Sequence, residues 1–345
     1  MTLPEALEDQ ARSCDALGSP FTARLLRLLA RRLQPGTPLA DRLLGWPGDI
    51  TSRGQSVPLR LAGALNALVL SGRDPALRGA WPPRTVPDEE LWPAVESALA
   101  NHADTIGHFL DSPPQTNEVG RSAVLIAAGH WLTDRFGLPL HLSELGASAG
   151  LNLNWDRYRL ALGTQAYGPG DAALTLAPEN RGALPPAARP AIAGRRGVDL
   201  APPDLADPDQ RRRLLAYVWP DQTARVERLA AALSLPQPPV DRGDGADWLA
   251  ARLAAPAPSG LHLVYHTIAW QYFGKATQTA CRAALAAAGA RATPEAPLAH
   301  LAMEADGAGP GAGLTLTLWP GGETLTLGRA DFHGRWLDWH PKPGA

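Results

Sequence analysis

A short stretch of small side chains has residue types and spacing that suit two different chemistries. The chain runs from Glu144-Leu145 into Gly146-Ala147-Ser148-Ala149-Gly150. As a G-x-S-x-G motif, the stretch predicts a nucleophile elbow in which Ser148 attacks an ester. As a carboxylate followed by a turn of small residues, it predicts the first turn of a nucleotide-type fold that holds a cofactor. The two hypotheses require different partners elsewhere in the chain.

The charge of Glu144 indicates which cofactor the turn suits. A G-x-G-x-x-G dinucleotide site needs a glycine-like residue where Leu151 stands, and a carboxylate is badly placed beside an anionic pyrophosphate. S-adenosylmethionine (SAM) has no phosphate and carries an ammonium and a sulfonium, so a carboxylate can form a charge-assisted hydrogen bond with it. Glycines let the backbone turn tightly and approach the ligand. The residues that we expect to bind SAM here are Glu144, Gly146, Ser148, Gly150 and Asn152.

Two later acids add to this prediction. The segment "VDRGDGADWL" resembles the third-strand segment of class I SAM-dependent methyltransferases, which implies that Asp244 meets the adenine amino group and that Gly245 leaves room for the ring. Asp199, at the end of the second predicted strand, is placed to bond the ribose hydroxyls. Both have alternatives, because Asp244 suits a helix N-cap and Asp199 lies so far from the glycine turn that an insertion must be assumed.

The candidates for chemistry follow the buried run "LHLVYHT", which we predict as the fourth strand. Methyl transfer is an in-line displacement in which the enzyme positions the acceptor, and a base helps when the acceptor is a hydroxyl or an amine. Tyr265 and His266 stand at the carboxyl end of this run and are the predicted catalytic residues. His266 can accept a proton near neutral pH, although a structural histidine bonded to a backbone carbonyl is the alternative.

Several polar and aromatic residues are predicted to line the acceptor site. Those in "QTNEVGR" lie at a helix start, where capping and the helix dipole also explain them. The aromatic residues have core packing as their alternative. The predicted substrate-binding residues are Asn117, Glu118, Arg121, Trp155, Trp270 and Gln271.

The elements that must position these residues change character near position 116. Before it, the apolar periodicity predicts helices, including runs in 19–33, 57–72 and 88–110. After it, strands alternate with helices, which indicates a parallel sheet. The chain ends in "GLTLTLWPGGETLTLG", a hairpin signal. We therefore predict a helical cap domain (1–115) and an α/β domain (116–345) with a Rossmann-like, mostly parallel sheet that ends in an antiparallel hairpin, as class I methyltransferase sheets do.

Composition limits the partners. The 345 residues include 45% hydrophobic residues and carry a formal net charge of −2, without the basic footprint of general nucleic-acid binding. No apolar run approaches the length of a membrane span, and the first residues lack an export signal, so we expect a cytoplasmic protein that does not bind membranes. Cys14 and Cys281 have no metal-type spacing, and we expect no metal site. A small-molecule acceptor is favoured, and the oligomeric state is not readable.

Longer segments carry a family resemblance. "QTNEVGRSA", "SELGASAGLNLNWDRY", "RRGVDLAPPDLADP", "YVWPDQTARVERL" and "YHTIAWQY" resemble a bacterial family known only as a domain of unknown function. The resemblance implies an affinity with methyltransferase-like Rossmann proteins, but it implies no reaction. Three hypotheses stay open: a SAM-dependent methyltransferase, a serine hydrolase in which Ser148 works with Asp244 and one of several histidines (His266, His300, His333), and a non-catalytic binding protein.

Overall fold

The computed structural model describes residues 1–256 and 259–343, which form two compact units. The first unit comprises Met1–Thr116 and Ala206–Ala230, and the second comprises Asn117–Leu205 and the remainder from Ala231 onward. The sequence predicts a single boundary near 115, so the return of residues 206–230 to the helical unit is a feature that only the structure reveals.

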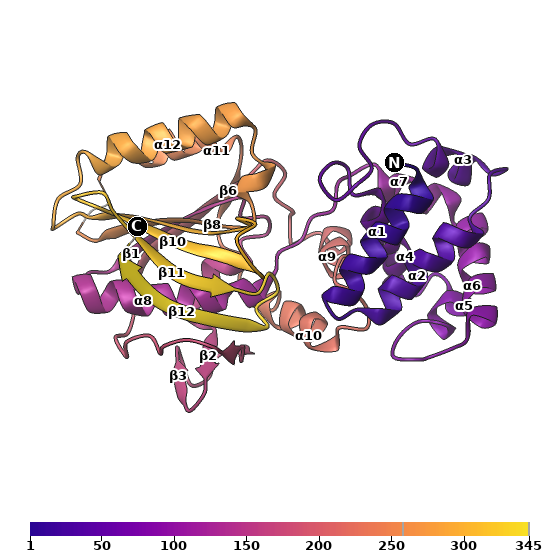
Figure 1. Cartoon of the computed structure of the whole chain (residues 1–345), viewed down its shortest axis with the longest axis horizontal. Helices are drawn as coiled ribbons and strands as arrows, with labels where there is room; N and C mark the ends of the chain where they lie inside the picture. The colour runs from indigo at the N-terminus through magenta and orange to yellow at the C-terminus, as the bar shows by residue number, and fades with distance from the viewer. Residues whose placement is uncertain (257–258, 344–345) are drawn as a thin grey trace. The chain divides into compact units, whose positions relative to one another are not determined.

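The first unit is built of helices around one apolar core. Leucines dominate that core, with Trp81, Trp92 and Trp219 among them. Asn66 donates from its side-chain amide to the carbonyls of Ala216 and Val218, and α9 packs against α4 (Figure 1). The helices of this unit are α1 (Leu3–Ala16), α2 (Pro20–Arg32), α3 (Pro38–Leu44), α4 (Val57–Ser71), α5 (Pro75–Gly79), α6 (Asp88–Asn101), α7 (Ala103–Leu110), α9 (Pro208–Ala216) and most of α10 (Thr223–Ala232).

The second unit is built on a nine-stranded sheet with the order β5-β12-β11-β10-β9-β8-β1-β6-β7. The strands of this sheet are β1 (Leu140–Leu145), β5 (Glu179–Asn180), β6 (Ile192–Asp199), β7 (Val240–Arg242), β8 (Leu261–Thr267), β9 (Leu298–Glu304), β10 (Ala312–Trp319), β11 (Glu323–Ala330) and β12 (Trp336–Pro343). A small second sheet has the order β3-β2-β4 and comprises β2 (Arg159–Leu162), β3 (Gln165–Tyr167) and β4 (Thr175–Leu176).

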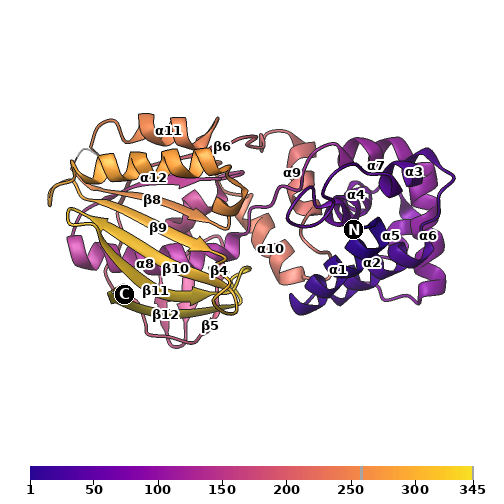
Figure 2. The ribbon, with the colours of Figure 1, turned by 45° about the horizontal axis from the view of Figure 1, so that its top comes forward.

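The two halves of the large sheet differ in direction. From β7 through β6, β1 and β8 to β9, every neighbouring pair is parallel. In chain order these five strands are 3-2-1-4-5, the arrangement of a doubly wound sheet, and the order reverses between β1 and β8. From β9 to β12 the pairs are antiparallel, and Figure 2 shows these strands side by side.

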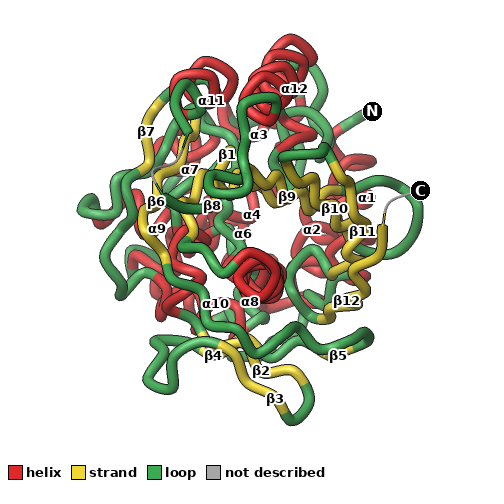
Figure 3. The backbone as a smooth tube through the Cα atoms, turned by 90° about the vertical axis from the view of Figure 1, so that its left-hand side faces the viewer, coloured by secondary structure: helices red, strands yellow, loops and turns green. Residues whose placement is uncertain are grey.

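Helices cover both faces of the sheet. Figure 3 shows α11 (Gly245–Arg252) and α12 (Lys275–Gly289) on one side and α8 (Ser122–Phe136) on the other. Leu145 and Val264 pack into a cluster with apolar residues of α11 and α12. Because side chains alternate along a strand, Glu144 and Tyr265 point to the α8 side, and His266 points to the α12 side.

The predicted fold class is confirmed: the chain is mixed α/β, with a large, mostly parallel sheet that ends in antiparallel strands, and with helices before it. The predicted hairpin is β10–β11, where Leu316 pairs with Leu325. One further strand, β12, follows it. Among the described residues, no helix is both long and apolar enough to cross a membrane.

Directly after the glycine turn the chain forms a 3-10 segment, η2 (Leu151–Arg157), where a nucleotide-type fold usually begins an α-helix. The carbonyl of Leu151 accepts a bond from the Tyr158 hydroxyl, 2.6 Å away, instead of serving an α-helical N–H. The side chain of Asn152 likewise forms hydrogen bonds with Ser122 and with the carbonyl of Glu118. The remaining crossover to β6 contains the small sheet, and this is the insertion that the position of Asp199 requires.

Candidate functional site

The glycine turn lies at the carboxyl end of β1, next to the point where the strand order reverses. Gly146 and Gly150 have φ angles of +68° and +75°, in the left-handed region that glycine adopts without strain. Ser148 has φ 51°, which is uncommon for a residue with a side chain. In open α/β sheets this edge and this position are where ligands bind.

Glu144 is the most unusual residue at this edge. It is 2% exposed, and its Oε2 has no hydrogen-bond partner among the described residues. Burial raises its pKa well above the usual value, the nearby Asp199 adds to this effect, and Arg121 opposes it. A buried carboxyl oxygen without a partner lowers the stability of the folded protein.

Asp199 lies at the end of β6, next to the turn, as predicted for the ribose acid. Its Oδ2 accepts a bond from the backbone N–H of Ser148 at 2.9 Å, and its Oδ1 accepts one from Ala201 at 2.9 Å. A carboxylate has about four acceptor positions, so both oxygens keep capacity for a further donor.

The segment before α8 contacts the glycine turn. Asn117 accepts a bond from the backbone N–H of Leu151 at 2.9 Å. Arg121 donates to the carbonyl of Thr267 at 2.9 Å and to that of Phe332 at 3.1 Å. Glu118 caps η1 (Val119–Arg121) by accepting from Gly120. Only the Glu118 bond is a local cap of the kind that the simpler explanation predicts, whereas Asn117 and Arg121 bond to distant segments.

Three predicted site residues are buried within the protein, although the indole Nε1 of Trp155 has no hydrogen-bond partner among the described residues. Asn152 accepts from the Ser122 hydroxyl and donates to the carbonyl of Glu118. Trp155 is 1% exposed and packs so closely on α8 that a methyl group on Gly129 would lie 2.3 Å from its ring. Tyr265 is fully buried, which raises its pKa well above the usual value, and its hydroxyl lies 3.3 Å from the carbonyl of Asn152. The side chains of Tyr265 and His266 point to opposite faces of β8.

Asp244 caps α11, as its simpler explanation predicts. Its carboxylate accepts from the backbone N–H of Ala246 at 2.8 Å and from the Thr277 hydroxyl at 3.0 Å. The ring of Phe273 lies beside Gly245, since a methyl group built there would be 3.3 Å from its Cε2. The same ring lies 3.7 Å from a methyl group built on Gly146, so an aromatic side chain faces both glycine-containing turns.

His266 is 2% exposed and its Nδ1 lies 2.7 Å from Oε1 of Glu304, the last residue of β9. The ring of Trp270 stacks on it, with centroids 4.8 Å apart. Trp270 is half-buried and Gln271 is exposed. Sequence reasoning missed Glu304, although its position at the carboxyl end of a parallel strand was a usable signal. The carboxylate partner differs from the backbone carbonyl that the structural alternative assumes.

A serine triad is not assembled at the turn. The Ser148 Oγ is buried and has no hydrogen-bond partner among the described residues, so no histidine there accepts its proton. Residues 1–256 and 259–343 contain no group of three or more His, Cys, Asp or Glu side chains that could hold a metal ion.

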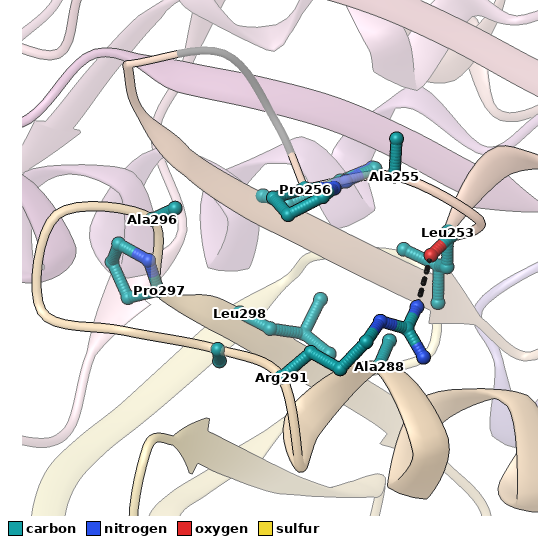
Figure 4. A pocket seen from close by; sticks show the side chains of 10 residues that line it. Leu253, Ala255, Pro256, Ala288, Arg291, Ala296, Pro297 and Leu298 are labelled. Atoms are coloured by element: carbon teal, nitrogen blue, oxygen red, sulfur yellow. Dashed lines mark hydrogen bonds between the residues drawn. The ribbon is translucent and has the colours of Figure 1, made fainter.

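A hollow lies elsewhere, beside the amino ends of β8 and β9 (Figure 4). Most of the side chains that line it are apolar, and the two polar ones are His262 and Arg291. Arg291 donates to the carbonyl of Leu253 at 2.7 Å, and burial lowers the pKa of His262 to about 3. The hollow is thus remote from the glycine turn, which lies at the opposite edge of the sheet.

Comparison with known proteins gives one result that covers nearly the whole chain. Residues 4–339 match a family described as an uncharacterised protein conserved in bacteria (DUF2332). No curated protein matches the sequence. Because the match spans both units, the chain belongs to the DUF2332 family of bacterial proteins.

Proposed function

We propose that this protein is a SAM-dependent methyltransferase that acts on a small acceptor. The observation that carries the proposal is the buried carboxyl of Glu144, with its unpartnered Oε2, beside a glycine turn at the reversal point of a doubly wound sheet. An ammonium group is the natural partner of such an oxygen, because charge-assisted bonds offset the cost of burial.

The donor set around the turn fits SAM better than a nucleotide phosphate. Glu144 would bond the ammonium, and Asp199, with acceptor capacity left, would bond the ribose hydroxyls. Phe273 lies beside Gly245, where the adenine ring would bind, and Asp244, which like Asp199 accepts one bond on each oxygen, keeps acceptor capacity for the adenine amino group. An anionic pyrophosphate suits this turn less well, because the two side chains that face it, Glu144 and Asp199, are acids.

The protein's own contribution to the reaction is positioning and exclusion of water. When bound, SAM supplies the methyl group on its sulfonium. The turn and Asp199 would hold the ligand across the carboxyl ends of β1 and β6, and the buried surroundings of Glu144 keep water away. His266 is the candidate group for taking a proton from the acceptor.

Calorimetry with SAM and with its demethylated product, S-adenosylhomocysteine (SAH), tests the proposal. Saturable binding by the wild-type protein is expected, and Glu144→Gln should weaken it by about tenfold to a hundredfold, the value of a hydrogen bond to a charged group. Glu323→Gln is the matched control, because Glu323 pairs with Arg135 on the surface. Absence of binding at high micromolar ligand, or equal losses in both variants, would reject the assignment.

A serine hydrolase is the second candidate, and the left-handed φ of Ser148 is the observation that favours it. The test is hydrolysis of p-nitrophenyl esters by the wild-type protein and by Ser148→Ala. If SAM is the ligand, Ser148→Ala retains SAH affinity within a few-fold and neither protein hydrolyses the ester. Ester hydrolysis that disappears in the variant would favour the hydrolase.

A further inference from the structure

One carboxylate oxygen of Glu304 bonds both to the candidate base, His266, and to the turn that covers this histidine. Oε1 of Glu304 accepts bonds from Nδ1 of His266 at 2.7 Å, from the backbone N–H of Ala269 at 3.0 Å and from that of Trp270 at 3.1 Å. The residues come from the ends of neighbouring parallel strands and from the segment that follows β8.

The bonding pattern fixes the proton on the histidine ring. The two backbone N–H groups can only donate, so Oε1 is an acceptor and Nδ1 carries the hydrogen that it donates. The neutral ring then has its lone pair at Nε2, the form that can accept a proton. Nε2 is buried and has no hydrogen-bond partner among the described residues. His300, whose ring centroid is 5.1 Å away, stays neutral because burial lowers its pKa to about 3.

The covering turn also touches the glycine turn. Trp270 stacks on the His266 ring at an interplanar angle of 17°. Ala269 lies against Gly146, since a methyl group built on that glycine would be 2.6 Å from the Ala269 Cβ. Ile268, which begins the segment, has φ 50°, a costly conformation for a β-branched residue. Residues 268–273 therefore cover the base and the cofactor turn together.

We propose that Glu304 is a positioning residue that sets the tautomer of His266 and anchors the cover formed by residues 268–273. This inference rests on the proposed methyltransferase function. In the transfer step, the proton of a hydroxyl or amine acceptor moves to Nε2 of His266. The acceptor's electron pair would form the bond to the methyl group that SAM supplies, and the pair of the broken C–S bond would stay on the sulfur of SAM. Glu304 stabilises the imidazolium that results, and the acceptor reaches Nε2 when the cover moves.

The first test is the ring-nitrogen NMR spectrum of His266 in the ligand-free protein, assigned with His266→Asn. The expected spectrum shows hydrogen on Nδ1. Glu304→Gln keeps an oxygen acceptor and should retain this tautomer, whereas Glu304→Ala should lose it. Hydrogen on Nε2 in the wild-type protein, or an unchanged tautomer in Glu304→Ala, would overturn the proposal. A purely structural role for Glu304 would affect melting temperature without this spectroscopic difference.

The second test measures the cover by chemical accessibility. Diethyl pyrocarbonate modifies neutral imidazoles, and mass spectrometry of the modified protein compares His266 with the exposed His108. Trp270→Ala should raise the relative rate at His266 by about tenfold or more, since removal of the ring makes local opening easier. Modification of His266 as fast as that of His108 in the wild-type protein would contradict the claim that residues 268–273 cover His266. If Glu304→Ala does not fold, the wild-type tautomer and the Trp270→Ala rate decide the outcome.

Both measurements are made without SAM, so their outcome is separate from that of the cofactor assignment. SAH calorimetry on the same proteins reports the cofactor. The expected tautomer without SAH binding would retain the positioning role but reject the methyl donor. SAH binding together with hydrogen on Nε2 of His266 would reject the positioning role of Glu304 and leave the cofactor assignment in place.

Discussion

The buried carboxyl of Glu144 links the stability of the sheet unit to ligand binding through a proton. Its pKa is raised in the folded protein, mainly by burial and further by Asp199. Above pH 4.5 the unfolded chain loses this proton while the folded chain keeps it, so the stability of the folded state falls as pH rises toward the folded pKa. The ammonium group of a bound ligand would favour the charged carboxylate of Glu144, so the folded protein with ligand would prefer the deprotonated form.

Glu144→Gln should therefore be more stable than the wild-type protein at pH 8, and the difference should shrink toward pH 4.5. The slope is at most about 1.4 kcal/mol per pH unit, the value for one proton. Urea unfolding of both proteins at several pH values measures it. A difference that does not change with pH would contradict the raised pKa.

SAH binding should release a proton from Glu144. The affinity of the wild-type protein should then increase with pH by up to about tenfold per unit below the folded pKa, because one proton leaves for each ligand bound. Calorimetry in two buffers with different ionisation enthalpies counts the proton. Glu144→Gln is the control, and an equal proton count in that variant would place the titrating group elsewhere.

The contact between the glycine turn and the segment after β8 explains why a glycine is needed at 146. The position combines a left-handed φ with a close approach to Ala269. Gly137, the C-cap of α8, has nearly the same φ, +65°, but open space where a side chain would go. Alanine substitutions at Gly137 and Gly146 therefore separate the free-energy cost of a left-handed backbone from the cost of the contact with Ala269.

Gly146→Ala should lower the free energy of unfolding by more than Gly137→Ala does. A left-handed non-glycine residue costs about 1–2 kcal/mol, and the added contact costs about 1–3 kcal/mol more. Chemical unfolding measures both variants. Ala269→Gly in the Gly146→Ala background should recover the contact part, and equal losses in the two single variants would show that the segments do not touch.

The helical unit is discontinuous in sequence, and a buried amide is among the groups that join its two parts. Asn66 on α4 donates to the carbonyls of Ala216 and Val218 and accepts from the indole N–H of Trp81. These bonds satisfy backbone groups at the end of α9 that would otherwise be buried without partners. A break in them leaves several polar groups unsatisfied at once.

Asn66→Ala should lower the free energy of unfolding by about 1–3 kcal/mol, the cost of unsatisfied buried groups. Asn101→Ala is the matched control, since Asn101 is exposed and its side-chain amide donates to the hydroxyl of the nearby Ser97. Thermal unfolding followed by circular dichroism compares the two. Equal melting temperatures would show that Asn66 does not join α4 to the end of α9.

The sequence by itself determined what depends on local periodicity. Alternating Leu and Thr predicted β10 and β11, the apolar run Leu261–Thr267 predicted β8, and helical spacing predicted α2, α4 and α8. Asp199 lies at the carboxyl end of β6, as the sequence predicts, and Asp244, which the resemblance to a methyltransferase segment singled out, follows β7 as the N-cap of α11.

Tertiary structure alone decided which residues meet and which are buried. The link between His266 and Glu304 joins positions 38 apart through the pairing of β8 and β9. The burial of Glu144 and Trp155, the 3-10 form of Leu151–Arg157 and the return of residues 206–230 to the helical unit likewise depend on distant partners. No local pattern encodes them, because burial and long-range pairing arise only when separate elements pack together.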